Sequence, residues 1–476
     1  MVYVPSILPV RILWPQWVGS AGATLVTIVA GLVAGWSSPY LAKLLADDSP
    51  LPITDSEASW IASLINVGRF VGGILTAVSI EYFGSRKTMF LIGFPSALGW
   101  IFIILANHVM WLYAARVLCG IGMGMTFGAF PIYIGEISDS YIRGALVTLA
   151  MNGGAVGNFL GNLMGSYMPM SYFAMITLVL IAIYVVLFAL VPESPHHLLR
   201  VGKLEEATKA YQWYHRGVEI KKEMEILKDY VFASKSTSFR DRLREFNAPQ
   251  NRRAGFIIIV LFMFMHLSGT NSLLFYMEII LTRAEVKAIA PSSVVVIAGA
   301  LSIVTGWLAM YLIERSGRRF LLIISSVGVF AAMMCLGLQF ALLDYQPDVP
   351  VMEWLPIGSM MVYQVFYSVG IMIIPSAVLS ELFPANLKSM AACGAGISSG
   401  VFAFVSSKTY QPMVDAMGEE YVFWLYGFIA VLAVPFAIFT MPETKGKSLQ
   451  EIQEILTDSV THGKSEHAKG MKNEEV

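Results

Sequence analysis

Charged residues are scarce in this chain of 476 residues: 14% are Asp, Glu, Lys or Arg, whereas 56% are hydrophobic. Soluble domains average about 25% charged residues, so the composition predicts a chain that lies within a lipid bilayer. The formal net charge is −1, without the basic excess that is typical of nucleic-acid-binding proteins. We therefore expect the bilayer as a partner and no nucleic acid.

Cysteine is also rare, and its three copies all lie in apolar stretches, where they are expected to be small packing residues rather than disulfides or metal ligands. No cluster of metal ligands and no arrangement of nucleophile and base stands out. The two Gly-Lys-Ser triplets lack the earlier glycine of a phosphate-binding loop. The sequence thus predicts no enzymatic activity, no metal site, no cofactor and no ATP drive. The three cysteines are Cys119, Cys335 and Cys393.

Long apolar runs are abundant, and roughly twelve of them reach the length of about 20 residues that spans a bilayer as a helix. The runs are continuous, unlike the alternating segments of a membrane β-barrel. A polar stretch with apolar residues at helical spacing interrupts them midway, as a cytoplasmic helical linker would. The sequence predicts an all-α membrane protein with twelve transmembrane helices in two six-helix bundles. The expected parts are residues 1–191 (first bundle), 192–253 (linker), 254–441 (second bundle) and 442–476 (cytoplasmic tail).

Three motifs of the first half return in the same order in the second half, shifted by about 240 residues. Such a constant shift is the sign of a duplicated half. In two of the motif copies an acid precedes a base by seven residues, which is two helical turns, so each pair is expected to fix the end of a membrane helix. The repeated acids are Glu81 with Glu314, Glu136 with Glu381, and Glu193 with Glu443, and the spaced bases are Arg143 and Lys388.

Together these motifs resemble the sugar porter family of the major facilitator superfamily. The stretches that carry the resemblance are RVLCGIGMGMTFGAFPIYIGEISDSYIRGAL, PESPHHLL, HLSGTN, ERSGRR, SELFP and PETKG, and GWSSP in the first span is most similar to insect trehalose and hexose facilitators. The resemblance implies facilitated diffusion of a neutral sugar, trehalose or hexose, across the plasma membrane by alternating access. Two alternatives stay open, namely a transporter-like sensor that moves little solute and a carrier of a non-sugar polyol.

The resemblance also implies a cytoplasmic latch of charged residues that joins the two bundles while the carrier faces outward. Hydrated charge pairs contribute only modest free energies, so they can break without unfolding the protein. The alternative is that these are solvated helix ends that follow the positive-inside rule. In the first latch loop Tyr82 and Ser85 replace two arginines of the family pattern. The expected latch residues are Glu81, Arg86, Glu136, Arg143, Glu314, Arg318, Glu381 and Lys388.

The expected sugar site departs from the family pattern. Met265 and His266 replace two glutamines of the seventh span, and Ser376 replaces a tryptophan that stacks on sugar in the tenth. A polar histidine in a span is costly to bury without a partner, so His266 either contacts the ligand or bonds to a neighbouring carbonyl. The resemblance assigns substrate binding to His266, Asn271, Ser302, Asn152, Ser376 and Ser399, and an extracellular gate to Phe275 and Tyr276.

Three further expectations concern coupling and orientation. The first span holds VAGLVAGWSSP, with no ionisable group where proton symporters of the family have an aspartate, so facilitated diffusion is favoured, although His266 or Glu278 could couple protons. Arg69, deep in the second span, either contacts substrate or bonds to backbone carbonyls. Basic loops on one side and acidic loops on the other predict that both termini are cytoplasmic, and the expected state is a monomer.

Overall fold

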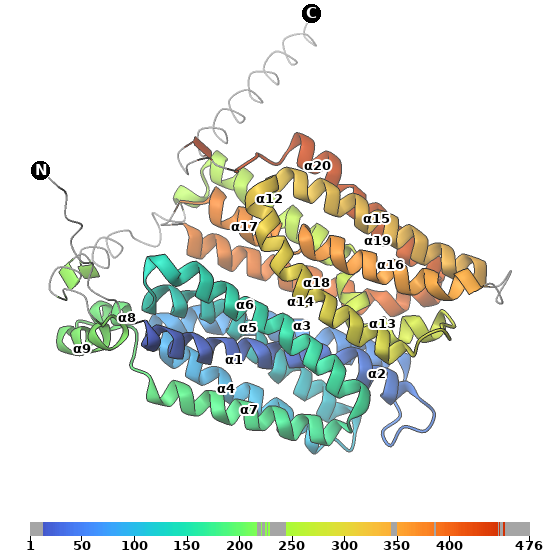
Figure 1. The fold of residues 1–476 in the computed structure, drawn as a ribbon, viewed down its shortest axis with the longest axis horizontal. Helices are drawn as coiled ribbons and strands as arrows, with labels where there is room; N and C mark the ends of the chain where they lie inside the picture. The colour runs from blue at the N-terminus through green and yellow to red at the C-terminus, as the bar shows by residue number, and fades with distance from the viewer. Residues whose placement is uncertain are drawn as a thin grey trace, which may run out of the picture. The chain divides into compact units, whose positions relative to one another are not determined.

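The computed structural model describes residues 13–216, 220, 224–225, 227–228, 244–343, 350–384, 387–445, 447 and 451–452. Most of the predicted tail, about a third of the linker, and Asp344 and Asp348 of one acidic loop lie outside these residues. The regular elements that the described residues form are helices (Figure 1).

The described part of the first half forms six helices of 20 or more residues and three shorter ones. Gly35 ends α1, and α2 follows within the same membrane-spanning stretch. The helices are α1 (Trp14–Gly35), α2 (Ser37–Leu45), α3 (Asp55–Phe83), α4 (Ser85–Ile104), α5 (Val109–Ile137), α6 (Ser140–Tyr167), α7 (Met170–Leu190), α8 (Pro195–Arg200) and α9 (Leu204–Tyr214).

The second half repeats this organisation, and three of its spans are also interrupted, between α12 and α13, between α16 and α17, and between α19 and α20. Its helices are α12 (Pro249–Leu267), α13 (Thr270–Arg283), α14 (Pro291–Ser316), α15 (Arg318–Leu343), α16 (Pro350–Val369), α17 (Ile374–Leu382), α18 (Lys388–Met417), α19 (Glu419–Val431) and α20 (Ala433–Phe439).

Eleven helical stretches of the described residues are long and apolar enough to cross a membrane. One more long helix, α6, is 28 residues long but is not among them. Its sequence contains three asparagines and several glycines, which lower its mean hydropathy. With α6 the long helical stretches number the roughly twelve that the sequence predicts.

The described chain divides into two compact units, and the division does not follow the two sequence halves. Unit 1 comprises residues 1–33, 68–158 and 169–237, and unit 2 comprises residues 34–67, 159–168 and 238–476. The start of α3 and the end of α6 thus group with helices of the second half. The predicted domain boundaries at residues 191, 253 and 441 stay a prediction.

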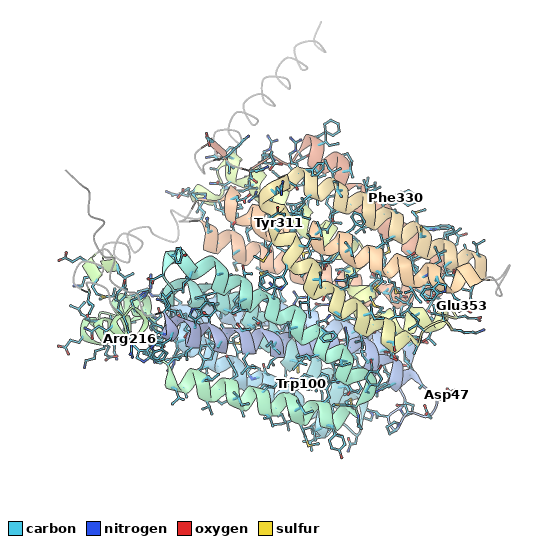
Figure 2. The ribbon with its side chains drawn as sticks, viewed as in Figure 1. Asp47, Trp100, Arg216, Tyr311, Phe330 and Glu353 are labelled. Atoms are coloured by element: carbon cyan, nitrogen blue, oxygen red, sulfur yellow. The ribbon has the colours of Figure 1, made fainter. Side chains whose placement is uncertain are left out.

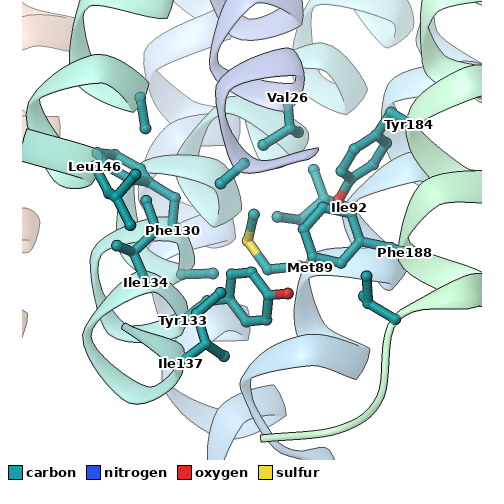
Figure 3. Packing of buried hydrophobic residues seen from close by; sticks show 14 of the residues in the cluster. Val26, Met89, Ile92, Phe130, Tyr133, Ile134, Ile137, Leu146, Tyr184 and Phe188 are labelled. Carbon is teal, nitrogen blue, oxygen red and sulfur yellow. The ribbon is translucent and has the colours of Figure 1, made fainter. Parts of the chain in front are cut away.

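Unit 1 has an apolar core in which α4 packs against α5 and α7. Figure 3 shows Met89 and Ile92 of α4 facing Tyr133 of α5 and Phe188 of α7. Trp100, further along α4, stacks on Phe173 with ring centroids 5.2 Å apart (Figure 2). Other apolar residues of α4, such as Phe94 and Leu98, are exposed, as on the lipid-facing side of a spanning helix.

The described part of the linker begins with the short helices α8 and α9, which pack on each other around buried Leu198, Leu199 and Ala207. Tyr214 at the end of α9 donates to the carbonyl of Pro192 at 2.8 Å and lies 3.2 Å from the hydroxyl of Tyr133. Nearby, the guanidinium of Arg216 lies 4.9 Å from the ring centroid of Trp14 (Figure 2). The linker is therefore anchored to α1 and α5 of its own unit.

Candidate functional site

A break in the seventh span positions the candidate sugar site in unit 2. Gly269 lies between α12 and α13 with a φ of +90°, a conformation that favours glycine because it has no Cβ. Two backbone carbonyls beside the break, one in the last turn of α12 and one just after it, accept hydrogen bonds from side chains. Two stacked tyrosines of α16 donate to them, Tyr363 to the carbonyl of Ser268 at 3.4 Å and Tyr367 to that of Met265 at 3.3 Å. Non-helical backbone is tolerated at membrane depth when protein groups satisfy it in this way.

His266, Asn271 and Ser399 form a hydrogen-bonded central cluster at this break. His266 is only 2% exposed; its Nε2 lies 2.8 Å from the Ser399 hydroxyl and its Nδ1 lies 3.2 Å from the Asn271 amide nitrogen. If Asn271 donates to Nδ1, the proton of the neutral imidazole sits on Nε2 and is donated to Ser399. The half-buried Ser399 hydroxyl then keeps its own proton for a ligand oxygen. Whether His266 contacts the ligand or is a structural residue stays a prediction.

The other predicted substrate residues do not join this cluster. Ser302 donates to the carbonyl of Gly299 at 2.6 Å within α14, and Asn152 donates to the carbonyl of Thr148 at 3.1 Å within α6. Ser376 is exposed on α17. Their assignment to substrate binding stays a prediction.

The predicted gate residues Phe275 and Tyr276 are both buried on α13. The ring of Tyr276 lies 4.9 Å from that of Tyr410 on α18, centroid to centroid. Ser272, one turn before Tyr276, lies 3.0 Å from the Tyr426 hydroxyl of α19. The α13 helix is thus packed into unit 2 through aromatic and hydroxyl contacts, and the gating role stays a prediction.

In unit 2 two of the predicted latch residues, Arg318 and Glu381, form an ion pair. Arg318 donates to Oε1 of Glu381 through Nε at 3.1 Å and Nη2 at 2.7 Å, and Thr444 donates to Oε2 at 2.5 Å. Lys388, which the spacing pairs with Glu381, is exposed as the first residue of α18. The partner of Glu381 is therefore not Lys388, the base nearest in sequence, but Arg318 of the repeated motif at the start of α15. The side chain of Glu314 lies outside the described residues.

In unit 1 the corresponding acid has a hydroxyl partner. Ser85 donates to Oε2 of Glu136, while Arg143 donates to the carbonyl of Ser138 at 3.2 Å and is exposed. The expected pairing of Glu136 with Arg143 is thus not the arrangement that the structure shows. Glu81 pairs instead with Arg200 of α8 at 3.1 Å. Of the predicted latch acids in unit 1, Glu136 therefore bonds to Ser85 and Glu81 to an arginine of the linker.

Two acids that the sequence pattern noted only as repeat markers cap helices in the structure. Glu193 accepts from the backbone N–H of Arg86 at 3.0 Å, at the start of α4. Glu443 accepts from the backbone N–H groups of Arg318 at 3.2 Å and Arg319 at 3.0 Å, at the start of α15. A carboxylate at a helix N-terminus accepts hydrogen bonds from the free N–H groups and interacts favourably with the positive end of the helix dipole.

The pKa values of these two capping acids shift in opposite directions. Burial raises the pKa of Glu193, and hydrogen bonds from Ser194 and Arg86 do not fully offset it. Burial also opposes ionisation of Glu443, but bonds from four backbone N–H groups outweigh it and hold its pKa below the ordinary 4.5. The second of these caps is thus the more strongly ionised.

The guanidinium groups beside the capping acids also correspond. Arg86 donates to the carbonyl of Ala189 at 2.8 Å, and Arg319 donates to that of Ala437 at 2.8 Å. In the repeat, Gly84 matches Gly317, so Ser85 matches Arg318 and Arg86 matches Arg319. The sequence identified Ser85 as a replaced arginine, and the structure shows that its loss leaves Glu136 without an arginine partner of this kind.

Two arginines lie within the helices of unit 1, one buried and one half-buried. Arg116 on α5 is 1% exposed and donates to the carbonyl of Val33 in the first span at 3.1 Å. Arg116 is the first residue of a motif quoted above, but the sequence analysis did not predict that its charge is buried. Arg69 is half-buried on α3, whose backbone approaches α5 so closely that a Cβ on Gly124 would collide with the Arg69 carbonyl. The role of Arg69 stays a prediction.

The model of the "Sugar (and other) transporter" family matches residues 23–456. The chain belongs to this sugar transporter family. It is 32% identical over 449 residues to the facilitated trehalose transporter Tret1 of Bombyx mori, covering 94% of this chain and 87% of that one. It is 30% identical to Tret1 of Aedes aegypti, covering 95% of this chain but only 56% of that longer one.

The fold is also that of solved sugar porters. An inward-open structure of the xylose transporter XylE from E. coli matches with a TM-score of 0.75 and 21% identity, over 92% of this chain and 99% of that one. XylE is a protein of the major facilitator superfamily. The all-α major facilitator fold predicted from the sequence is confirmed.

Proposed function

We propose that this sugar transporter family member carries a neutral sugar, trehalose or a hexose, down its gradient across the plasma membrane. The substrate class is supported by its relatives, since the two Tret1 proteins are named as trehalose transporters. The single observation in the chain itself that carries the proposal is the central cluster. It offers hydrogen-bond donors and acceptors from His266, Asn271 and Ser399 to a ligand rich in hydroxyl groups.

Uniport rather than proton symport is supported by the first span. The segment from Val29 to Pro39 contains no ionisable side chain. The buried guanidinium of Arg116 donates there to a backbone carbonyl, that of Val33, and a carbonyl does not take up a proton at physiological pH. A fixed charge held by a carbonyl does not provide the proton cycle that a carboxylate partner would.

We further propose that the carrier is a monomer with both termini in the cytoplasm. The orientation rests on the charge distribution of the loops. Arg86, Lys87, Arg315, Arg318 and Arg319 gather at one set of helix ends, whereas the opposite loops are acidic. The latch clusters then lie on the cytoplasmic side, and the ends of α2, α13 and α18 lie outside.

The test is uptake of labelled trehalose and labelled glucose into sugar-transport-deficient cells that express the chain, at two external pH values. Saturable uptake of one sugar, unchanged between the two pH values, supports the proposal. Uptake stimulated by acid would contradict uniport and point to His266 or Glu278. Absence of uptake of both sugars, with the protein confirmed at the cell surface, would contradict the substrate and leave the polyol carrier or the sensor as the function.

A further inference from the structure

A polar face of α3 packs against second-half helices within unit 2. Asn66 is fully buried, and its amide donates to the carbonyl of Ala403 at 3.2 Å and to the hydroxyl of Ser407 at 3.0 Å, both on α18. Two turns earlier, Ser59 donates to the carbonyl of Lys408 at 3.3 Å. The α3 helix thus meets α18 along a line of hydrogen bonds rather than through an apolar seam.

The same packing includes a ring contact. The ammonium of Lys408 lies 4.1 Å from the ring centroid of Trp60, within the range of a cation–π interaction. Trp60 belongs to α3 and Lys408 to α18. The contact adds a second kind of bond between a first-half helix and a second-half helix.

Arg283 lies at the outer end of this face and bonds to both sequence halves. It donates to Oδ1 of Asp55, the first residue of α3, at 3.1 Å. It also donates to Oε1 of Glu419, at the start of α19, at 2.9 Å, and to Oε1 of Gln411 on α18 at 3.4 Å. The cross-half bond is to Asp55, while Glu419 and Gln411 belong to the same half as Arg283.

We propose that Arg283 and Asp55 form an outer latch, which holds the outer ends of α3 and α13 together and sets how often the carrier opens to the outside. This inference rests on the proposed alternating-access function. When the outer ends separate, the bond between Arg283 and Asp55 has to break, because the two residues sit on different halves. The bonds of Arg283 to its own half need not break.

The exposure of the three charged side chains suits this role. The side chain of Asp55 is 56% exposed and that of Arg283 is 29% exposed, whereas that of Glu419 is 9% exposed. A pair with one well-hydrated partner is weak and breaks readily. The more buried carboxylate of Glu419 stays bonded to Arg283 when the outer end opens. Opening therefore leaves no buried charge without a partner, a loss that would be much more costly.

The experiment uses the full-length carrier in membranes with a cysteine at Ser63. Ser63 is fully buried on α3, one turn after Ser59, and its hydroxyl bonds only to the carbonyl of Trp60 in its own helix. The rate of labelling of Ser63→Cys by a membrane-impermeant thiol reagent, without sugar, reports opening of the outer end. The background from the native cysteines is subtracted with the parent that lacks this substitution.

Asp55→Asn is the test variant and Glu57→Gln is the matched control. Glu57 lies in the same first turn of α3 and accepts from the backbone N–H and the hydroxyl of Thr54. Its substitution removes the same charge from the same helix end, and the glutamine can still accept these bonds. We expect Asp55→Asn to raise the labelling rate by about two- to five-fold. Glu57→Gln should leave it unchanged.

Equal labelling of Asp55→Asn and Glu57→Gln would overturn the outer latch, and so would a Ser63→Cys reporter that is unreactive in every variant. Because labelling needs no sugar, it is independent of the substrate. Sugar uptake together with unchanged labelling would overturn the latch and leave the proposed function standing. Faster labelling in Asp55→Asn without any sugar uptake would support the latch and contradict the proposed substrate.

Discussion

Arg318 donates two hydrogen bonds to the same carboxylate oxygen of Glu381, from Nε at 3.1 Å and from Nη2 at 2.7 Å. At the matching place in the first half, Ser85 presents a single hydroxyl to Glu136. The two copies of the predicted latch are therefore unequal. A charged donor bonds more strongly than a neutral one, so the copy in unit 2 is the stronger.

The unequal latch predicts a sharp contrast between two bases near Glu381. Arg318→Gln should lower the free energy of unfolding by about 2 kcal/mol, because it removes a charge-assisted, largely buried contact. Lys388→Gln, at an exposed residue, should change it by less than about 0.5 kcal/mol. Thermal unfolding of the purified variants measures both. Equal shifts would mean that Lys388, as the sequence spacing suggests, is the working partner.

The central cluster predicts that an amide can replace the imidazole of His266 but an alkyl group cannot. His266→Leu leaves Asn271 and Ser399 without their partner in a buried place, at a cost of about 1–3 kcal/mol. We expect it to lower the initial rate of sugar uptake at least about ten-fold, whereas His266→Gln should stay within a few-fold of the parent. Concentration-dependent uptake, corrected for protein at the surface, distinguishes them. Parental uptake in His266→Leu would remove His266 from the site.

The cap at Glu443 predicts a pH-dependent contribution to stability. Its pKa is lower in the folded protein than the ordinary 4.5, so its contribution is present above about 4.5 and is lost as the pH falls through the folded value. The difference in melting temperature between the parent and Glu443→Gln should be largest at neutral pH and should shrink under acid. A difference that stays constant from pH 7 to pH 4 would contradict the ionised cap.

Close packing in unit 1 predicts opposite results for two glycines of the same helix. A Cβ on Gly157 would collide with the carbonyl of Ile28 on α1, whereas a Cβ on Gly144 would meet nothing within 4 Å. Gly157→Ala should therefore destabilise the protein by more than about 2 kcal/mol. Gly144→Ala should be neutral or stabilise it by up to about 1 kcal/mol, because alanine favours the helix. Chemical or thermal unfolding of both variants tests the close approach of α6 to α1. A Gly157→Ala protein as stable as the parent would contradict it.

Sequence reasoning predicted the fold well because its signals are local or repeated. Continuous apolar runs specify spanning helices in a bilayer, and the duplicated motifs correctly marked Glu136, Glu381 and the capping acids as corresponding positions. It also singled out Ser85 as a replaced arginine. It did not predict the partners of Glu136 and Glu381. Sequence spacing favours Arg143 and Lys388, whereas the bonded side chains, Ser85 and Arg318, come from other helices.

The contacts of the central cluster and of the outer latch could not be predicted from the pattern. Ser399 reaches His266 from 133 positions away in the chain, and Asp55 reaches Arg283 from 228 positions away. Only the packing of α18 and of α3 in unit 2 brings these side chains together. Arg283 belongs to none of the sequence motifs. From the sequence alone it could not be distinguished from a solvent-exposed base at a helix end.

The most direct test of the account is the equilibrium distribution of labelled sugar in liposomes that contain the purified carrier. A uniporter brings the internal concentration to the external one and no further, whatever pH gradient is imposed. We predict a final ratio of about 1 with and without an inward proton gradient, reached faster than in empty liposomes. Accumulation of sugar above the external concentration, driven by the proton gradient, would contradict facilitated diffusion.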